Sequence, residues 1–360
     1  MQQVLLITDI NFWVKGAGHR MRIYNLVDYL VHHVQLTILY LGADDPARRS
    51  VLHGKIAEVC FLPVEIIATA TMEQTGLYVS ALLKDRNFDA IIVEYIHNTY
   101  LLNYIDLDNA ITILDAHDLI SERTKAFKKY NYQSLFEMSE EFEFQVFDIY
   151  DHVIVLCGAD QEKINSFFDY PKALLCSHST SVSYHDTRPT VSNLAFIASE
   201  YDPNIDAIHF FIENCWPAVQ EKYNVTLSVY GNVCRKIRAA GKGIILNGFV
   251  ADLQEIYKNV DIVINPVRFG AGLKIKNIEA LANGKPLVTS AHGARGLEMA
   301  DGKAFLTANE PAHILDALSL LIENTDRRLE LSRNAYDFIR KYFSAETAFA
   351  PLLEVINNAE

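Results

Sequence analysis

The stretch 261–297, DIVINPVRFGAGLKIKNIEALANGKPLVTSAHGARGL, limits most strongly what this chain can fold into. It predicts, in order, a buried strand at 261–267, a glycine loop at 268–273, an amphipathic helix at 274–283 and a second strand at 286–290. An apolar run of strand length, then helical spacing, then another such run is the βαβ pattern of a parallel sheet. The loop after the first strand is therefore expected at the carboxyl edge of the sheet, where ligands bind and a helix begins.

This loop and the start of its helix carry the charge that an anion site needs. Two kinds of group contribute: cationic side chains, and backbone N–H groups that are expected to point outward at the helix amino terminus. We predict a phosphate or diphosphate site made by Arg268, Gly270, Ala271, Gly272, Leu273, Lys274 and Lys276.

Glu279 lies on the flank of the apolar stripe that Ile275, Ile278 and Ala282 form at helical spacing. A partly desolvated carboxylate needs hydrogen-bond donors, and a pair of ribose or sugar hydroxyls would supply them. The alternative is a surface Glu–Lys pair at helical spacing.

The run GxGLKxKxxEALAxGKPLVTSxxGxxGL resembles the donor-binding segment of retaining glycosyltransferases of family 4, which have the GT-B fold. The resemblance implies that Glu279 holds the ribose of a nucleotide and that the loop 270–273 contacts the diphosphate and the sugar. Members of that family usually carry a second glutamate eight residues earlier, where this chain has Ala271. Many members also place an arginine and a lysine in the loop that corresponds to 199–203, and this chain has neither.

Composition bounds the class of protein. The 360 residues are 50% hydrophobic and 21% charged, which suits one large or two medium globular domains. The net charge of −13 argues against a nucleic-acid partner, because a surface that binds a duplex needs a basic excess. A pocket for a single nucleotide needs only local positive charge.

The five cysteines are scattered and include no CxxC pair, which argues against a zinc site or a disulfide framework. The chain lacks the basic start and cleavage site of a signal peptide, and no apolar run approaches about 18 residues. We therefore expect a cytoplasmic protein, with at most peripheral contact at the inner surface of a membrane.

Strands and helices alternate through the first half of the chain, as in a doubly wound sheet. The predicted strands are 4–10, 34–41, 61–67, 88–94, 111–114 and 151–156, and the predicted helices are 21–31, 72–84 and 160–167.

A glycine loop, residues 11–20, separates the first strand from its helix. Gly16 and Gly18 suggest the dinucleotide-binding fingerprint, but its third glycine is Met21 here, and the loop is about twice as long as that motif requires. A plain connecting loop is one interpretation. We favour a loop that faces an interdomain cleft on the acceptor side, formed by Gly16, Gly18, His19 and Arg20, with Arg22 close by.

The tetrapeptide Asp115-Ala116-His117-Asp118 follows a predicted strand, at the edge where such sheets place their chemistry. A carboxylate at Asp115 or Asp118 could fix the tautomer of His117 and raise its pKa. A lone histidine is more often structural. The resembling family carries a histidine here, beside the transferring sugar, so we predict catalytic roles for His117 and Asp118.

Two other charged stretches have simpler interpretations. Residues 121–133 are basic and could face an anionic or lipid-linked acceptor, but a solvated helix face is the stronger interpretation. Asp106 and Asp108 make a DxD pair of the kind that holds a metal in other sugar transferases, but acidic residues are ordinary in a turn. We predict no metal site.

The irregular, polar stretch 184–192 predicts a linker. The second domain is expected to open with a strand at 194–198 and a helix at 204–223, which Asn204 would cap. The resemblance places Gly231 close to the nucleotide and lets 248–250 border the base. Three helical patterns follow at 311–323, 327–342 and 345–358, and the family resemblance implies that the last crosses back to the first domain.

The predicted architecture is GT-B: two doubly wound, Rossmann-like domains, 1–186 and 187–340, facing across a cleft, with a terminal segment 341–360 on the first domain. The resemblance implies a metal-independent retaining hexosyltransferase without a cofactor, which moves a sugar from a nucleoside-diphosphate-sugar to a glycan or a lipid-linked acceptor. Two alternatives remain, a GT-B-like scaffold subunit that binds without transferring sugar and a sugar-nucleotide epimerase.

Overall fold

The computed structural model describes residues 1–14, 16–47, 56, 58–238 and 241–358, and these form two compact units. The first unit comprises Met1–Glu122, Phe136–Ser179 and Ala345–Glu360, and the second comprises Arg123–Leu135 and Thr180–Ser344. The sequence analysis placed domain boundaries at 186/187 and 340/341, whereas the units divide at 179/180 and 344/345. The assignment of 123–135 to the second unit was not predicted.

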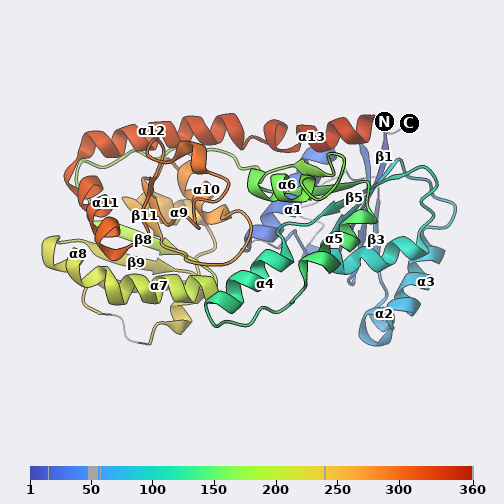
Figure 1. The fold of residues 1–360 in the computed structure, drawn as a ribbon, viewed down its shortest axis with the longest axis horizontal. Helices are drawn as coiled ribbons and strands as arrows, with labels where there is room; N and C mark the ends of the chain where they lie inside the picture. The colour runs from blue at the N-terminus through green and yellow to red at the C-terminus, as the bar shows by residue number, and fades with distance from the viewer. Residues whose placement is uncertain (15, 48–55, 57, 239–240, 359–360) are drawn as a thin grey trace. The chain divides into compact units, whose positions relative to one another are not determined.

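The described part of the first unit contains a seven-stranded parallel sheet in the order β3-β2-β1-β4-β5-β6-β7 (Figure 1). Its strands are β1 (Gln3–Thr8), β2 (Gln35–Tyr40), β3 (Glu58–Phe61), β4 (Ala90–Glu94), β5 (Ile111–Asp115), β6 (His152–Val155) and β7 (Ala173–Leu175). The chain reverses its direction of winding between β1 and β4, because β1 pairs with β2 on one side and β4 on the other. The carboxyl ends of β1, β4 and β5 therefore lie at the switch point, where such sheets bind ligands.

The described part of the second unit contains a six-stranded parallel sheet in the order β10-β9-β8-β11-β12-β13. Its strands are β8 (Asn193–Ile197), β9 (Thr226–Tyr230), β10 (Ile244–Gly248), β11 (Ile262–Asn265), β12 (Leu287–Thr289) and β13 (Leu306–Thr307). The switch point here is between β8 and β11, which pair directly. The two doubly wound sheets confirm the predicted fold class.

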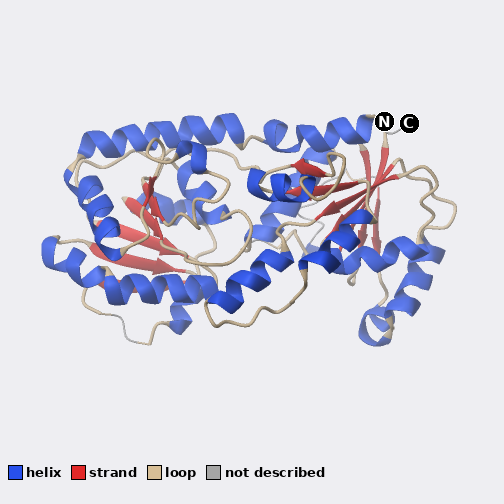
Figure 2. Ribbon diagram, in the orientation of Figure 1, coloured by secondary structure: helices blue, strands red, loops and turns tan. Residues whose placement is uncertain are grey.

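Helices surround both sheets (Figure 2). In the first unit they are α1 (Gly18–Leu30), α2 (Val64–Thr69), α3 (Met72–Leu82), the 3₁₀ helix η2 (Ile96–Tyr104), α5 (Glu140–Asp148), α6 (Gly158–Asn165) and α13 (Ala345–Asn357). In the second they are α7 (Asp202–Asn214), α8 (Trp216–Lys222), η3 (Asn232–Lys236), α9 (Leu253–Asn259), α10 (Ile275–Ala282), η4 (Glu298–Ala300), α11 (Pro311–Glu323) and α12 (Thr325–Tyr342). The helix α4 (Ile120–Lys129) contains the division between the units.

The structure corrects two predictions around α7. The helix predicted at 204–223 is two helices, because the chain breaks at Cys215 and Pro217 lies in the first turn of α8. Asn204 is not the cap of α7: the N-cap residue is Tyr201, whose side chain accepts no capping hydrogen bond, and Asn204 lies inside the first turn.

Continuous apolar strands give each unit its core, as expected for parallel sheets covered on both faces. In the first unit the helices α1 and α13 cover one face, where Phe349 and Leu352 are fully buried with the side chains of β1. The terminal helix thus completes a core that begins with the first strand of the chain.

Candidate functional site

The glycine loop between β11 and α10 is held in a conformation that few residues other than glycine adopt. Gly270 has a φ of 123° and Gly272 a φ of 64°, both in the region that disfavours side chains. Lys274 closes the loop by donating from Nζ to the carbonyl oxygens of Ala271 and Gly272, at 3.0 and 2.8 Å. The lysine thus supports the loop with its own charge, and the βαβ unit that the sequence predicted is present.

Arg268, predicted as a phosphate ligand, is bound to a carboxylate. Its Nε and Nη2 donate to the two carboxylate oxygens of Asp206 at 2.9 and 2.6 Å, a bidentate pair. The guanidinium also lies over the rings of Tyr130 and Phe210, at 5.5 and 4.7 Å from their centroids. Its charge is therefore balanced within the second unit.

Phe269 anchors the loop to the segment 123–135. Its ring is 1% exposed and stacks on Tyr130 and Tyr132 at centroid distances of 4.7 and 4.9 Å, with Phe127 edge-on at 5.2 Å. Such aromatic pairs are worth roughly 0.5–1.5 kcal/mol each beyond their buried area. These contacts explain why 123–135 groups with the second unit.

A buried amide network, which the sequence analysis missed, ties α10 to both flanking strands. Asn277, fully buried on α10, accepts from the Asn265 amide at 2.8 Å and donates to Thr289 Oγ1 at 3.1 Å and to the Gly293 carbonyl at 2.8 Å. A Cβ at Gly293 would lie 2.1 Å from Thr289 Oγ1, so glycine is required there. The single asparagine in an otherwise apolar helix face was the available signal.

Lys276 spans the switch point between β8 and β11. Its Nζ donates to Asn204 Oδ1 at 2.5 Å and lies 5.0 Å from the centroid of the Phe196 ring at the end of β8. Burial, with a smaller contribution from Lys274, lowers the pKa of Lys276 to about 7. Without a bound anion, keeping the buried ammonium group of Lys276 charged costs free energy. A bound anion would offset this cost.

Glu279 lies one helical turn beyond Lys276, as the sequence predicted for a carboxylate on the flank of the apolar stripe. Burial raises the pKa of Glu279 to about 7, and Lys276 opposes that rise. The hydroxyl of Tyr257 on α9 is fully buried and has no hydrogen-bond partner among the described residues, and Glu279 is its electrostatic neighbour. The carboxyl of Glu279 and the hydroxyl of Tyr257 are thus neighbouring polar groups on α10 and α9. The sequence did not point to Tyr257, because this residue lies on another helix.

His292, in the turn after β12, faces the glycine loop. Its Nε2 is buried, has no hydrogen-bond partner in the part of the chain that the structure describes, and lies 3.7 Å from the position of a Cβ on Gly270. Burial, followed by the charges of Lys274 and Arg295, lowers the pKa of His292 to about 3. The imidazole is therefore neutral and offers a hydrogen bond beside the loop.

Gly231 is where the chain leaves β9, with a φ of 95°. A Cβ there would lie 2.1 Å from the Ala198 carbonyl oxygen, and its N–H donates to the Gly248 carbonyl at 2.6 Å. Its role is to let the carboxyl ends of β8 and β9 approach each other closely.

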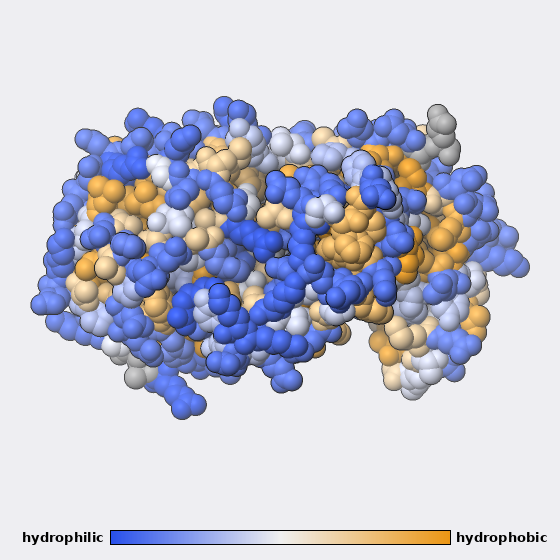
Figure 3. Space-filling view, viewed as in Figure 1, coloured by the Kyte–Doolittle hydropathy of each residue, from blue (hydrophilic) through white to orange (hydrophobic). Residues whose placement is uncertain are grey.

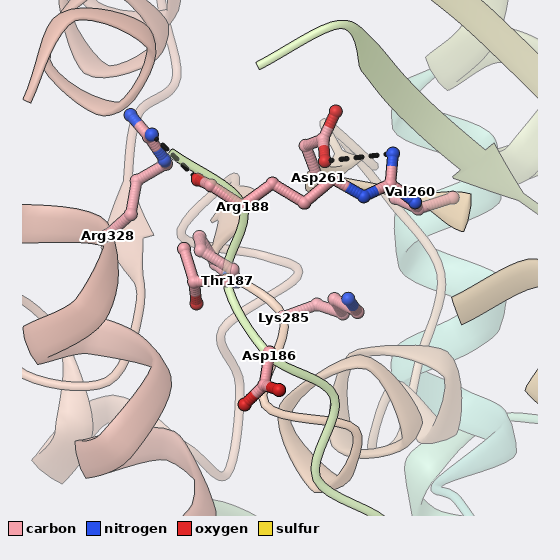
Figure 4. A pocket seen from close by; sticks show the side chains of 8 residues that line it. Asp186, Thr187, Arg188, Val260, Asp261, Lys285 and Arg328 are labelled. Atoms are coloured by element: carbon pink, nitrogen blue, oxygen red, sulfur yellow. Dashed lines mark hydrogen bonds and ion pairs between the residues drawn. The ribbon is translucent and has the colours of Figure 1, made fainter. Parts of the chain in front are cut away.

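A small pocket lies at the opposite end of the second sheet, before β11 and β12 (Figure 4). Arg328 donates there to the carbonyls of Arg188 and Pro189, and Arg188 lies 3.5 Å from Asp261. Burial lowers the pKa of Lys285 to about 8. This cluster holds the linker 184–192 against the amino ends of β11 and β12. It is therefore separate from the glycine loop, which follows the carboxyl end of β11.

In the first unit, His117 belongs to a buried cluster at the switch point. Its Nε2 lies 2.6 Å from an Oε2 of Glu94, while Arg22 donates to Asp115 at 2.9 Å. Glu94 and Asp115 are register partners at the ends of β4 and β5, and both are fully buried. The ring of Tyr95 stacks on the imidazole at 4.1 Å with an interplanar angle of 5°.

The structure changes which carboxylate contacts His117. The sequence analysis named Asp115 or Asp118, whereas the hydrogen-bonded residue is Glu94, 23 positions earlier in the chain. Burial opposes a charged imidazole, but Asp115 and the bond to Glu94 outweigh it and raise the pKa of His117. Asp118 is half-buried immediately before α4.

The predicted acceptor-side loop reaches this cluster in part. Gly16 has a φ of 113°, and Gly18 is the first residue of α1. His19 lies close enough to His117 for its pKa to be lowered, first by burial and then by that charge. Arg20 has a buried Nε that bonds to none of the residues that the structure describes. Arg22, expected near a ligand, is instead fully buried against Asp115.

The acidic pair Asp106 and Asp108 has a structural explanation. In the DxD pair the Asp108 N–H donates to Asp106 Oδ1 at 3.3 Å, which makes an ordinary acidic turn. Figure 3 shows a hydrophobic area on the visible face near α5. Phe142 on α5 and Ile149 just after it are 54% and 57% exposed. None of the described helices is long and apolar enough to span a bilayer.

Residues 192–324 match the family model described as glycosyl transferases group 1. Over 318 residues the chain is 22% identical to the "Uncharacterized 44.6 kDa protein in cps region" of Klebsiella pneumoniae. This match covers 82% of this chain and 79% of that protein. A shorter match, 29% over 99 residues, covers 27% of this chain and 22% of the D-inositol 3-phosphate glycosyltransferase of Corynebacterium kroppenstedtii.

Solved structures share the fold over nearly the whole chain. The crystal structure of TarM superposes with a TM-score of 0.77 at 12% identity, covering 99% of both chains. Anabaena Alr3699/HepE, solved with UDP and glucose, superposes with a TM-score of 0.74 at 14% identity, covering 99% of this chain and 100% of the other. These likenesses show that the chain has the fold of these proteins.

Proposed function

We propose that this protein is a retaining, metal-independent glycosyltransferase of family 4. It would move a hexose from a nucleoside-diphosphate-sugar to a hydroxyl of a glycan or a lipid-linked acceptor. The observation that carries the proposal is the Lys276–Glu279 pair behind the glycine loop, at the switch point of a unit that matches the group 1 transferases. The proposed protein is cytoplasmic, with at most peripheral contact at the inner surface of a membrane.

The chemistry follows from where charge develops. The bond between the anomeric carbon and the diphosphate breaks, and its electron pair leaves with the diphosphate. The acceptor oxygen bonds to the carbon, and the proton of the acceptor hydroxyl passes to the departing diphosphate. Fixed donors aimed at the departing oxygens stabilise this transition state. Lys274, Lys276, the amino terminus of α10 and the neutral His292 are the donors that the second unit offers.

Glu279 would receive the ribose. Its carboxylate, with a pKa of about 7, accepts hydrogen bonds from two neighbouring hydroxyls. On the other substrate, His117 would contact the reacting groups, with His19 and Arg20 on the acceptor side.

The first prediction tests donor binding. Calorimetry should detect UDP or GDP binding to the wild type, and Glu279→Ala should weaken it about 10- to 100-fold, because the ribose loses charge-assisted hydrogen bonds worth roughly 1.5–3 kcal/mol. Glu255→Ala removes a carboxylate from the neighbouring α9 and should leave the affinity unchanged. Absence of any nucleotide binding would contradict the transferase proposal.

A second function, binding without transfer, is favoured by two specific observations. Ala271 replaces a glutamate that the resembling family uses, and the charge of Arg268 is taken by Asp206. Nucleotide binding with neither donor hydrolysis nor transfer, tested with a panel of nucleotide sugars in the presence of EDTA, would favour this scaffold role. Transfer that EDTA abolishes would contradict metal independence.

A further inference from the structure

The contacts of its ring and its backbone conformation fix the orientation of His117. Its φ is 60° and that of Tyr95 is 65°, so both residues occupy the left-handed region at the ends of adjacent strands. The flat stack of the two rings and the 2.6 Å contact with Glu94 then fix the imidazole in its plane and in its rotation. Backbone strain of this kind persists where the surroundings demand one orientation.

The two imidazole nitrogens have different environments. Nε2 meets a fully buried carboxylate, whereas Nδ1 has no hydrogen bond with any of the described residues and is not sealed from solvent. Burial and the charge of Asp115 raise the pKa of Glu94 to about 7. In its ionised form Glu94 accepts a hydrogen bond from the Nε2–H of His117, which keeps a hydrogen on Nε2. Nδ1 is then the nitrogen available to a ligand.

The charges around the cluster suit one bound proton. Glu94 on β4 and Asp115 on β5 are two buried acids, and Arg22 on α1 supplies one buried cation. Among the described residues, Asp9 after β1, Asp118 before α4 and His19 on α1 are further titratable groups whose charges reach the His117–Tyr95 pair. A protonated imidazole between Glu94 and Asp115 would bring the buried set of four groups to neutrality, which favours its charged form in a site of low polarity.

We infer that Glu94 is a positioning residue, which binds Nε2 of His117 and so presents Nδ1 to the substrate while the Tyr95 ring fixes the plane of the imidazole. The inference rests on the proposed function for the identity of the substrate, an oxygen-bearing sugar or acceptor. The fixed tautomer itself is a property of the free protein.

Glu94, Asp115 and His117 could also be interpreted as metal ligands, because their ligand atoms lie within 4.8 Å of one another. Arg22 already donates to Asp115, and a divalent cation would add two charges beside this buried guanidinium. We therefore assign the positive charge at this site to Arg22 and the imidazole.

The test begins with the wild-type protein in its full length. Long-range ¹H–¹⁵N correlation spectra of the histidine rings, with His117 assigned from His117→Gln, report which nitrogen carries the proton. We expect Nε2 to remain protonated through the titration and Nδ1 to titrate above the ordinary histidine value near 6.5. A proton on Nδ1 with a bare Nε2 would overturn the inference, as would a shift of both nitrogens on adding ZnCl₂.

Glu94→Gln then removes the charge while keeping the size of the side chain. The pKa of His117 should fall, because one of the two carboxylates that favour the imidazolium is gone, and kcat should fall about 10- to 100-fold. Affinity for UDP should stay within about twofold, since the nucleotide contacts are in the second unit. Unchanged titration of His117 in Glu94→Gln would overturn the inference.

The matched control is Glu58→Gln, which removes a carboxylate from β3 of the same sheet, where it pairs with Arg86 at the surface. It should leave the titration and kcat as in the wild type. The two proposals fail separately: a wild type that binds no nucleotide contradicts the proposed function, whereas the tautomer of His117 is decided by the spectra alone.

Discussion

Burial and charge conflict at Lys276. This residue lies in the first turn of α10, donates to Asn204 and has its ammonium over the ring of Phe196, and its pKa is about 7 instead of the ordinary value near 10.5. Near neutral pH, without a bound anion, the side chain of Lys276 is therefore only partly protonated. The negative charge of a diphosphate would favour the protonated, charged form.

This predicts that nucleotide binding takes up a proton. The bound anion raises the pKa of Lys276, so at pH 8, above the free value and below the bound one, up to one proton should be absorbed with UDP. The affinity should accordingly fall as the pH rises from 7 to 9. Calorimetry at pH 8 in buffers of different ionisation enthalpy measures the uptake.

Lys276→Arg is the control for this measurement, because a guanidinium stays charged at every pH in the range. The variant should lose the proton uptake and retain most of the affinity. Equal uptake in the variant and the wild type would assign the proton to another group, such as Glu279 or the nucleotide itself.

At the scale of elements, the βαβ unit of β11, α10 and β12 depends on hydrogen bonds as much as on apolar packing. Asn277 accepts from Asn265 and donates to Thr289 Oγ1 and to the Gly293 carbonyl, so one amide holds two strands and the turn that presents His292. Removing one partner of a buried network leaves other groups unpaired, which costs about 1–3 kcal/mol for each group.

Gly293→Ala tests the tightness of this unit. The new Cβ would lie 2.1 Å from Thr289 Oγ1 and 3.2 Å from the Asn265 carbonyl, and it should lower the free energy of unfolding by about 1–3 kcal/mol. Urea unfolding followed by the fluorescence of Trp216, in a Trp13→Phe background, reports on the second unit.

Gly241→Ala is the matched control in the same unit, since its Cβ would meet a single side-chain atom at 3.7 Å. That change should stay within about 0.5 kcal/mol. Equal stability of the two variants would mean that the turn relaxes and that the network does not restrict it.

At the scale of the whole molecule, the chain leaves each unit and returns to it. The first unit is closed by α13 from the carboxyl terminus, where Phe349 lies 5.5 Å from the ring of Tyr29 and 5.6 Å from the Arg22 guanidinium. The second unit takes in 123–135, whose aromatic side chains cover Phe269. Each unit thus depends on a segment distant in the chain.

Phe349→Ala should therefore destabilise the first unit by about 3–5 kcal/mol, because it removes a fully buried ring and uncovers Arg22. Urea unfolding followed by Trp13 fluorescence, in a Trp216→Phe background, measures this loss. Trp216 fluorescence in the complementary Trp13→Phe background should report an unchanged stability of the second unit. The control is Leu320→Ala, at a 42%-exposed position of α11, which should leave the stability unchanged in either background. Loss of stability in the second unit instead would contradict the placement of α13.

Local sequence pattern determined most of the architecture. Apolar runs of strand length, alternating with amphipathic helices, were enough to predict the doubly wound sheets, the glycine loop before α10 and the three terminal helices, since these depend on residues close together in the chain. The pattern also located His117, because a residue two positions after a buried strand must lie at the carboxyl edge of its sheet.

Tertiary structure decided which charges remain available. Arg268, predicted as a phosphate ligand, donates from Nε and Nη2 to Asp206, which lies 62 positions away in the chain. Glu94 contacts His117 only because β4 and β5 are neighbours in register, and Asn204 contacts Lys276 only across the switch point. Periodicity reports which face of an element is buried. The partner that a buried charge meets depends on strand order and register, which bring together residues far apart in the sequence.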